Sequence, residues 1–147
     1  MYKKIYDIPI PAEGDLPFQL PGWIACAPFE EFLGMRIDEV GEGRAVLTMP
    51  FKVKLAQGKG FMHGGAITAL ADTAVAIAIK SVLPEGTNFV TMELGLKFHA
   101  PIRYGVVKAE ARIIDQNDRD IRGVAEIFDE RGLKVATFTS VFRVRRR

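Results

Sequence analysis

The chain is poor in the residues that build several common kinds of site. It has one cysteine, Cys26, and two histidines, His63 and His99, among 147 residues. A single cysteine excludes an intrachain disulfide framework, so we expect a cytoplasmic location. These residues are also too few for a zinc cluster. No Gly-x-Ser-x-Gly element, Walker loop or strand-linked Gly-x-Gly-x-x-Gly is present, which argues against serine-hydrolase, P-loop and dinucleotide-binding chemistry.

Excess charge of one sign is also lacking. The net charge is +2, and Arg143, Arg145, Arg146 and Arg147 supply four positive charges at the end, so the rest of the chain carries −2. A near-neutral body with a basic tail argues against a nucleic-acid partner. The tail is either a solvated strand end or a local phosphate contact. The first residues have no uninterrupted apolar core, so no secretory signal is expected.

Residues 58–82, GKGFMHGGAITALADTAVAIAIKSV, are the most distinctive stretch. Apolar residues follow the glycines with helical spacing and fill every face, which predicts a buried helix. Asp72 lies near its centre, and an ionised carboxylate there is costly unless it is partnered. Asp72 is therefore a site candidate, and it also argues against a membrane span.

The remaining sequence predicts an irregular arm over residues 1–27 and a single domain over residues 28–147. Four prolines in the arm exclude a helix or a central strand. Five or six strands with short connections surround the predicted helix in sequence, and such strands must be antiparallel. The expected fold class is α+β with a segregated helix. The sheet can cover only one side of that helix, so a second copy of the chain is the candidate to cover the other.

Gly64 opens the predicted helix. Amide groups of a first helical turn have no intrahelical acceptor and carry partial positive charge, so the Gly64 N–H can polarise a carbonyl. His63 either caps the helix or takes a direct chemical role. Gly64 and Asp72 are eight residues apart, roughly 12 Å along one helix. Groups acting on one carbonyl must both lie about 3 Å from it, so two antiparallel copies are needed.

The stretch His63-Gly64-Gly65 followed by Leu70-Ala71-Asp72-Thr73-Ala74 resembles the hotdog-fold acyl-CoA thioesterases, the phenylacetate-pathway type in particular. The resemblance extends over residues 28–144. It implies a hotdog fold, in which a long central helix is wrapped by a five- to six-stranded antiparallel sheet. It also implies a homodimer, often as a dimer of dimers, that hydrolyses short-chain, medium-chain or aromatic acyl-CoA without a metal.

Carried over by position, the resemblance makes Asp72 the nucleophile or general base. The Gly64 N–H would polarise the thioester carbonyl, with Gly65 beside it in contact with the substrate. Thr91 matches a Ser/Thr position that holds the water or the acid.

Gln57 matches a position where the phenylacetate type usually has Asn, whereas a branch acting on an aromatic acyl-CoA has Gln. Either amide would position water or the thioester. The hydroxyl that the Gln branch carries one turn past the acid would fall at Ala76, so that feature is absent here. Lys59, Lys97, Arg103 and the terminal arginines are candidate partners for the phosphates of CoA.

Other interpretations stay open. Asp72 could be a structural acid, Gln57 a plain loop residue, Thr91 an ordinary strand residue and the basic side chains merely solvated. A hotdog hydratase or dehydratase acting on enoyl or hydroxyacyl thioesters would pair an acid with a catalytic histidine, for which His63 is the candidate. A non-catalytic acyl-CoA binding module is the third class.

Overall fold

The structure, a computed structural model, describes residues 5–145. Its elements are α1 (Pro28–Leu33), β1 (Arg36–Gly41), β2 (Arg44–Pro50), the 3-10 turn η1 (Val53–Leu55), α2 (Gly64–Lys80), β3 (Asn88–Phe98), β4 (Val106–Gln116), β5 (Asp120–Phe128) and β6 (Lys134–Arg145). Residues 5–27 contain neither helix nor strand. The turn η1 lies in the connection between β2 and α2.

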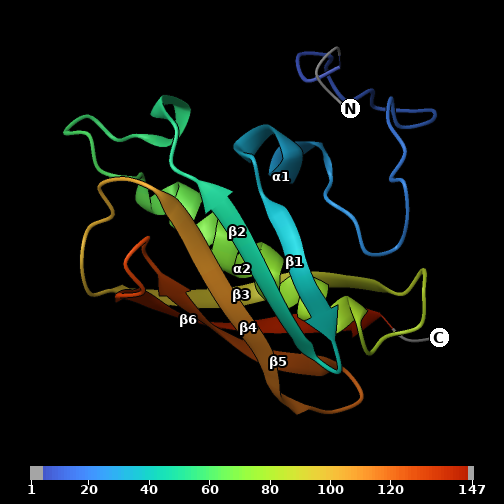
Figure 1. Ribbon diagram of the computed structural model, residues 1–147. Coiled ribbons are helices and arrows are strands. Elements are labelled where there is room, and N and C mark those ends of the chain that lie inside the picture. The colour runs from blue at the N-terminus through green and yellow to red at the C-terminus, as the bar shows by residue number, and fades with distance from the viewer. Residues whose placement is uncertain (1–4, 146–147) are drawn as a thin grey trace.

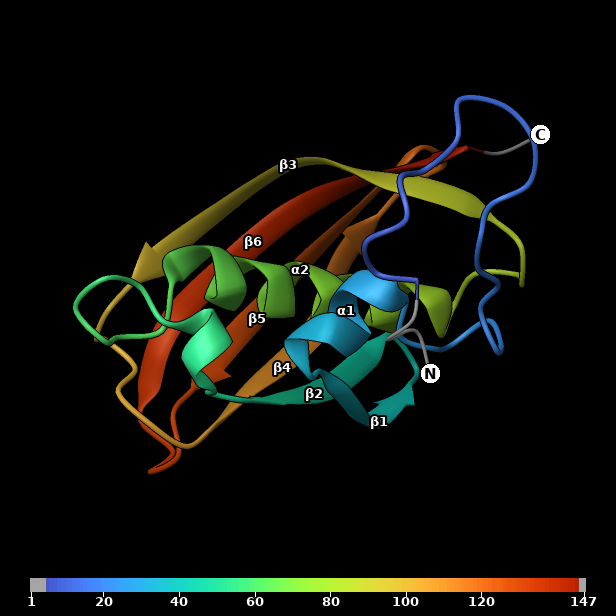
Figure 2. The same cartoon turned by 90° about the horizontal axis from the view of Figure 1, so that it is seen from above.

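The six strands form one antiparallel sheet in the order β1-β2-β4-β5-β6-β3. The sheet curves around α2, which runs along its concave face (Figures 1 and 2). The long helix is inserted after the first hairpin, so β3 reaches the far edge and pairs with β6. The predicted fold class, a hotdog fold with a helix wrapped by an antiparallel sheet, is confirmed.

Local sequence signals account for the first elements. Pro28 begins α1, and Gly34 ends it in the left-handed region at φ 86°, where its N–H donates to carbonyls of the last turn. In the turn between β1 and β2, Glu42 (φ 52°) and Gly43 (φ 76°) both adopt positive φ. A pair of positive φ values suits the tight connection of a twisted hairpin.

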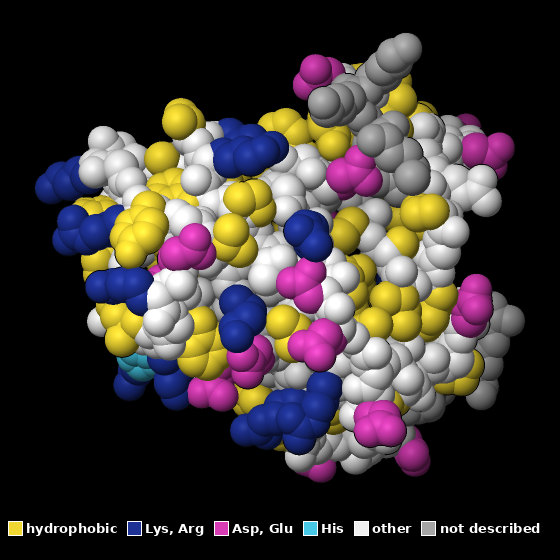
Figure 3. Space-filling model, in the orientation of Figure 1, with side chains coloured by type: hydrophobic (Ala, Val, Ile, Leu, Met, Phe, Trp, Pro, Cys, Tyr) yellow, Lys and Arg dark blue, Asp and Glu magenta, His cyan; other side chains and the backbone are white. Residues whose placement is uncertain are grey.

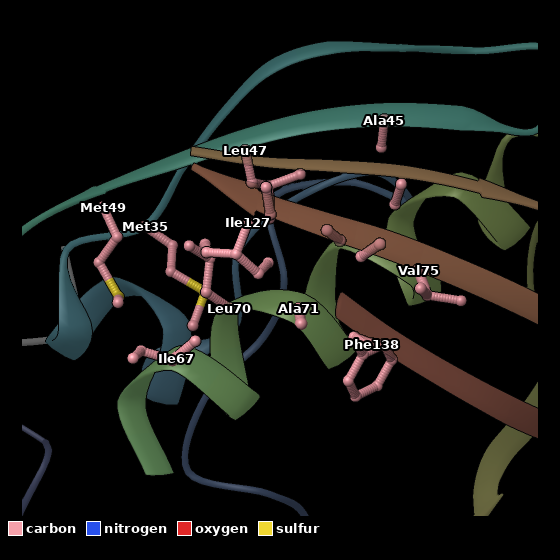
Figure 4. Close-up of a cluster of buried hydrophobic side chains, with 14 of the residues drawn as sticks. Met35, Ala45, Leu47, Met49, Ile67, Leu70, Ala71, Val75, Ile127 and Phe138 are labelled. Atoms are coloured by element: carbon pink, nitrogen blue, oxygen red, sulfur yellow. The ribbon is translucent and has the colours of Figure 1, made fainter. Parts of the chain in front are cut away.

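The core lies between α2 and the sheet. Ile67, Leu70 and Val75 of the helix meet Leu47 of β2 and Phe138 of β6 (Figure 4), all of them at most 3% exposed. The alanines on the same side of α2 have short side chains, which allows the sheet to approach the helix closely. Burial of this apolar surface is the main stabilising contribution to the fold.

The sheet lies very close to α2 at Gly123 of β5. A methyl group there would lie 2.4 Å from Cγ1 of Val75, a buried side chain of α2. We expect Gly123→Ala to lower the free energy of unfolding by about 1–3 kcal/mol, because the helix must shift to make room. Urea unfolding followed by circular dichroism measures this. Gly95→Ala is the matched strand control, since its methyl group would make an ordinary 3.5 Å contact with Thr139. Equal losses in the two variants would contradict the close approach.

One stripe of α2 remains open in the single chain. Thr68, Ala69, Asp72, Thr73 and Ala76 are all half-buried, although the residues between and beyond them are mostly buried. Their spacing of three and four residues puts them on one face of the helix. The sheet therefore leaves uncovered the side on which Asp72 lies, and the predicted all-round burial is not reached within one chain.

Among residues 5–145, none of the helices is long and apolar enough to cross a membrane. Within the same range, no group of three or more His, Cys, Asp and Glu side chains is placed to hold a metal ion.

Candidate active site

His63 is the cap of α2. Its backbone is extended (φ −60°, ψ 134°), and its Nδ1 accepts a hydrogen bond from the Gly65 N–H at 2.8 Å. Its own N–H donates to the Leu55 carbonyl at 2.8 Å, which ties the helix start to η1. Of the two roles left open for His63, the geometry shows the structural one. It also shows that the Gly65 amide, predicted to contact substrate, donates within the chain.

The Gly64 N–H is the unused donor at this helix start. Within residues 5–145 it has no acceptor, while the next three amides donate to His63. A methyl group at Gly64 would lie 3.2 Å from Cζ of Phe98, at the end of β3. The half-exposed ring of Phe98 therefore flanks the amide. No pattern in the sequence indicates this neighbour, because only the sheet order brings the end of β3 to the start of α2.

Asp72 lies about 12 Å along the helix from Gly64. Thr91 of β3 donates its hydroxyl to both carboxylate oxygens, at 3.1 Å to Oδ1 and 3.3 Å to Oδ2. Burial raises the pKa of the Asp72 carboxyl above its usual range, and the Thr91 hydrogen bond lowers it in part. The structure thus brings the predicted acid and the predicted hydroxyl into contact, and a partly desolvated carboxylate is a stronger base.

Gln57 shapes the loop before α2. Its side-chain oxygen accepts from the Lys59 N–H, and its backbone N–H donates to the Phe61 carbonyl at 2.8 Å. The Gly60 N–H closes the turn on the Gln57 carbonyl at 2.9 Å. Gln57 is therefore at the Gly64 end of the helix, far from Asp72 of the same chain. Its side-chain oxygen takes part in ordering the loop.

The basic candidates lie in different places. Lys59 is exposed in the loop before α2, and the Arg103 guanidinium lies 4.9 Å from the centre of the Phe61 ring in the neighbouring connection. Lys97 alternates with Leu96 and Phe98, so it points to the outer face of the sheet, away from Gly64. Figure 3 shows lysines and arginines gathered at the end of the molecule where the loop before α2 lies.

Of the terminal arginines, Arg143 and Arg145 are at the other end of the sheet. The Arg143 Nε donates to Asp120 at 2.5 Å, and Arg145 pairs in register with Asn88. Arg146 and Arg147 lie outside the described residues. The structure thus does not bring the predicted phosphate contacts together within one chain.

A hollow of about 470 Å³ opens beside Asp72. Its walls come from the open stripe of α2, the first half of β3 and the N-terminal arm, which contributes Leu20, Trp23, Ala25 and Ala27. The sequence did not indicate what the arm covers.

The model of the thioesterase superfamily matches residues 59–136, more than half of the chain, including Gly64, Asp72 and Thr91. The chain belongs to the thioesterase superfamily.

Individual thioesterase relatives agree with this assignment. Proofreading thioesterase EntH from Klebsiella pneumoniae is 30% identical over 105 residues, covering 71% of this chain and 77% of that protein. A candidate esterase from Halobacterium salinarum is 34% identical over 101 residues, and the match covers 65% of each protein, just under two thirds of the relative's length. The predicted enzyme class, a thioester hydrolase, is confirmed.

Solved structures share the fold. A mutant of the phenylacetic acid degradation protein PaaI from Thermus thermophilus superposes with a TM-score of 0.73 at 29% identity, covering 80% of this chain and 98% of that one. A conserved protein from Pseudomonas aeruginosa gives a TM-score of 0.78 at 25% identity, covering 82% and 95%. The resemblance to PaaI-like hotdog thioesterases is therefore confirmed.

Proposed function

We propose that this thioesterase hydrolyses short-chain, medium-chain or aromatic acyl-CoA without a metal, with Asp72 as nucleophile or general base and the Gly64 N–H as the group that polarises the thioester carbonyl. The observation that carries the proposal is the Asp72–Thr91 pair. It places a partly desolvated carboxylate on the open stripe of α2, beside a hollow that can receive an acyl group.

The reaction balances with these groups alone. As a general base, ionised Asp72 takes a proton from water while the oxygen of that water attacks the thioester carbon. The charge that develops on the carbonyl oxygen is stabilised by the Gly64 N–H. The C–S bond then breaks, and the thiolate takes up the proton to leave free thiol and acid. As a nucleophile, the Asp72 carboxylate instead attacks the thioester carbon, and the C–S bond breaks to release thiolate and leave a mixed anhydride. Water then hydrolyses the anhydride, which regenerates the carboxylate, and the thiolate takes up the released proton to give the same products.

The two groups are proposed to come from different subunits of a homodimer, and two such homodimers are proposed to form a dimer of dimers. Gly64 and Asp72 of one chain are about 12 Å apart, too far to act on one carbonyl. The open stripe of α2 and the edge strand β3 support a two-fold partner here. Val90 and Met92 on that edge are 61% and 54% exposed, an unusual state for apolar strand residues.

A panel of acyl-CoAs with aryl, short and long acyl groups tests the activity. We expect release of free thiol that depends on enzyme concentration. Loss of enoyl absorbance without thiol release would instead identify a hydratase, and saturable binding without either signal would identify a binding module. His63 weighs against the hydratase, because its Nδ1 already accepts from Gly65.

The pH dependence of turnover should respond to Thr91. Its hydroxyl lowers the raised pKa of Asp72, so Thr91→Val removes that effect and the pKa rises further. Because the ionised form is needed, the acid limb of the kcat profile should move to higher pH. Thr91→Ser keeps the hydroxyl and should keep the wild-type limb. Profiles of kcat against pH for the three proteins check this. An acid limb at the wild-type position in Thr91→Val would show that Thr91 does not influence the titration of the group that controls turnover.

A further inference from the structure

The N-terminal arm is fastened to the C-terminal end of α2. The Trp23 indole donates to the Lys80 carbonyl at 3.0 Å, and the Lys80 ammonium donates to the Trp23 carbonyl at 2.9 Å. The ammonium also lies 4.8 Å from the centre of the indole ring. Two reciprocal hydrogen bonds and a cation–π contact join residues 57 positions apart. Figure 2 shows the arm folded back over this end of the molecule.

The Lys80 side chain is partly withdrawn from water. Burial lowers the pKa of its ammonium, with the Glu30 charge acting in the opposite direction. Such a group is costly unless its donors are satisfied. The Trp23 carbonyl supplies an acceptor for the Lys80 ammonium. We call this paired contact between Trp23 and Lys80 the clasp, and it satisfies a donor of the partly buried ammonium as well as holding the arm on the helix.

Trp23 and Lys80 line the hollow beside Asp72. Asp72, Ala76 and Lys80 follow one another at intervals of four residues on one face of α2, so the clasp lies about 12 Å from the carboxylate. Phe89 and Phe142 line the same hollow, with ring centres 5.7 Å apart. Aromatic rings and the small side chain of Ala76 thus line part of the space between acid and clasp, and polar side chains such as Glu30 and Asn88 line the rest.

Resting on the proposed thioesterase function, we propose that residues 20–27 form the end wall of the acyl pocket and that Trp23 determines specificity. The wall limits the acyl group to a short chain or a single ring and obstructs long chains. The proposed occupant is the acyl part of the thioester, since the hollow begins at the carboxylate proposed to act on the carbonyl and continues past Ala76, Phe89 and Phe142.

Trp23 is the single tryptophan of the chain, so its fluorescence reports on the proposed end wall without interference from another tryptophan. Phenylacetyl-CoA is titrated into full-length Asp72→Asn protein, which is expected to turn it over about 10³-fold more slowly than the wild type, with free CoA as the matched control. We expect a saturable change in Trp23 emission with phenylacetyl-CoA and none with free CoA. Calorimetry on the same samples reports binding independently. If calorimetry shows that phenylacetyl-CoA binds while Trp23 emission stays unchanged, the proposed end wall is wrong. An equal emission change with free CoA would also contradict it.

Acyl-length profiles test the same wall by activity. We expect Trp23→Ala to raise kcat/KM for decanoyl-CoA by about tenfold relative to butyryl-CoA, because an open end admits further methylenes. Leu16→Ala, on an exposed part of the same arm outside the hollow, should keep the wild-type ratio. Trp23→Phe keeps a ring but cannot donate to Lys80, and it should retain the short-chain preference. An unchanged ratio in Trp23→Ala, or the same rise in Leu16→Ala, would contradict the proposal.

Different results would contradict the end wall and the proposed thioesterase function. If the wild type releases thiol but Trp23 emission does not change on acyl-CoA binding, the proposed end wall is wrong and the proposed function stands. Absence of both thiol release and acyl-CoA binding would overturn the proposed function, and the wall with it.

Discussion

Asp72→Asn should lower kcat by about 10³-fold on every acyl-CoA that the wild-type protein hydrolyses. The substitution keeps the size of the side chain and an oxygen that can accept from Thr91, but it removes the charge that acts as base or nucleophile. Thiol release under single-turnover and steady-state conditions measures the loss. Because the thioester still fits the hollow, KM or Kd should change far less than kcat.

Stability provides the control for this variant. Burial raises the pKa of folded Asp72 above its unfolded value, so the native state holds this proton more tightly. The associated stability is present below the unfolded pKa and is lost as the pH rises through the folded pKa. Near pH 7, ionised Asp72 therefore weakens the fold, and Asp72→Asn should unfold at the same or a higher urea concentration. A structural acid would give the reverse: lower stability with turnover close to wild type.

Much of the fold follows from local signals in the sequence. The apolar run after Gly64, the Pro28 and Gly34 ends of α1 and the short turns between strands each constrain their own neighbourhood. Such signals can be recognised in the sequence because caps, turn glycines and period-2 alternation act over a few residues. The acid and the helix-start amide were predictable for the same reason: both belong to one helix.

The features that were not predictable depend on contacts between distant segments. Trp23 meets Lys80, and Phe98 meets Gly64, only because the sheet order and the path of the arm bring them together. The arm has no periodicity that would reveal its docking surface. Thr91 shows the intermediate case, since the family resemblance indicated its role and the register of β3 then placed its hydroxyl on Asp72. Lys97 faces away from Gly64 because a strand alternates its faces.

The Gly64 amide can be removed without breaking α2. Gly64→Pro deletes the N–H at the first helical position, where proline is favoured, and His63 already has the extended backbone that a following proline requires (ψ 134°). We expect kcat to fall by about 10²–10³-fold, the usual effect of losing one oxyanion donor. Gly64→Ala is the matched control. It adds the same Cβ against the half-exposed Phe98 ring but keeps the N–H, so it should retain most activity. Equal losses in both variants would point to crowding by the side chain instead.

Combining the two inactive variants tests whether each site is shared between subunits. A heterodimer of one Asp72→Asn chain and one Gly64→Pro chain has one site with both lesions and one site with neither. If acid and amide come from different subunits, the purified heterodimer should regain about half of the wild-type kcat per dimer, although both parent homodimers are nearly inactive. If both groups of a site belonged to one chain, each site would carry one lesion and mixing would restore nothing. Co-expression with two affinity tags isolates the heterodimer. The roughly 12 Å between Gly64 and Asp72 on one rigid helix is what makes restoration the expected result.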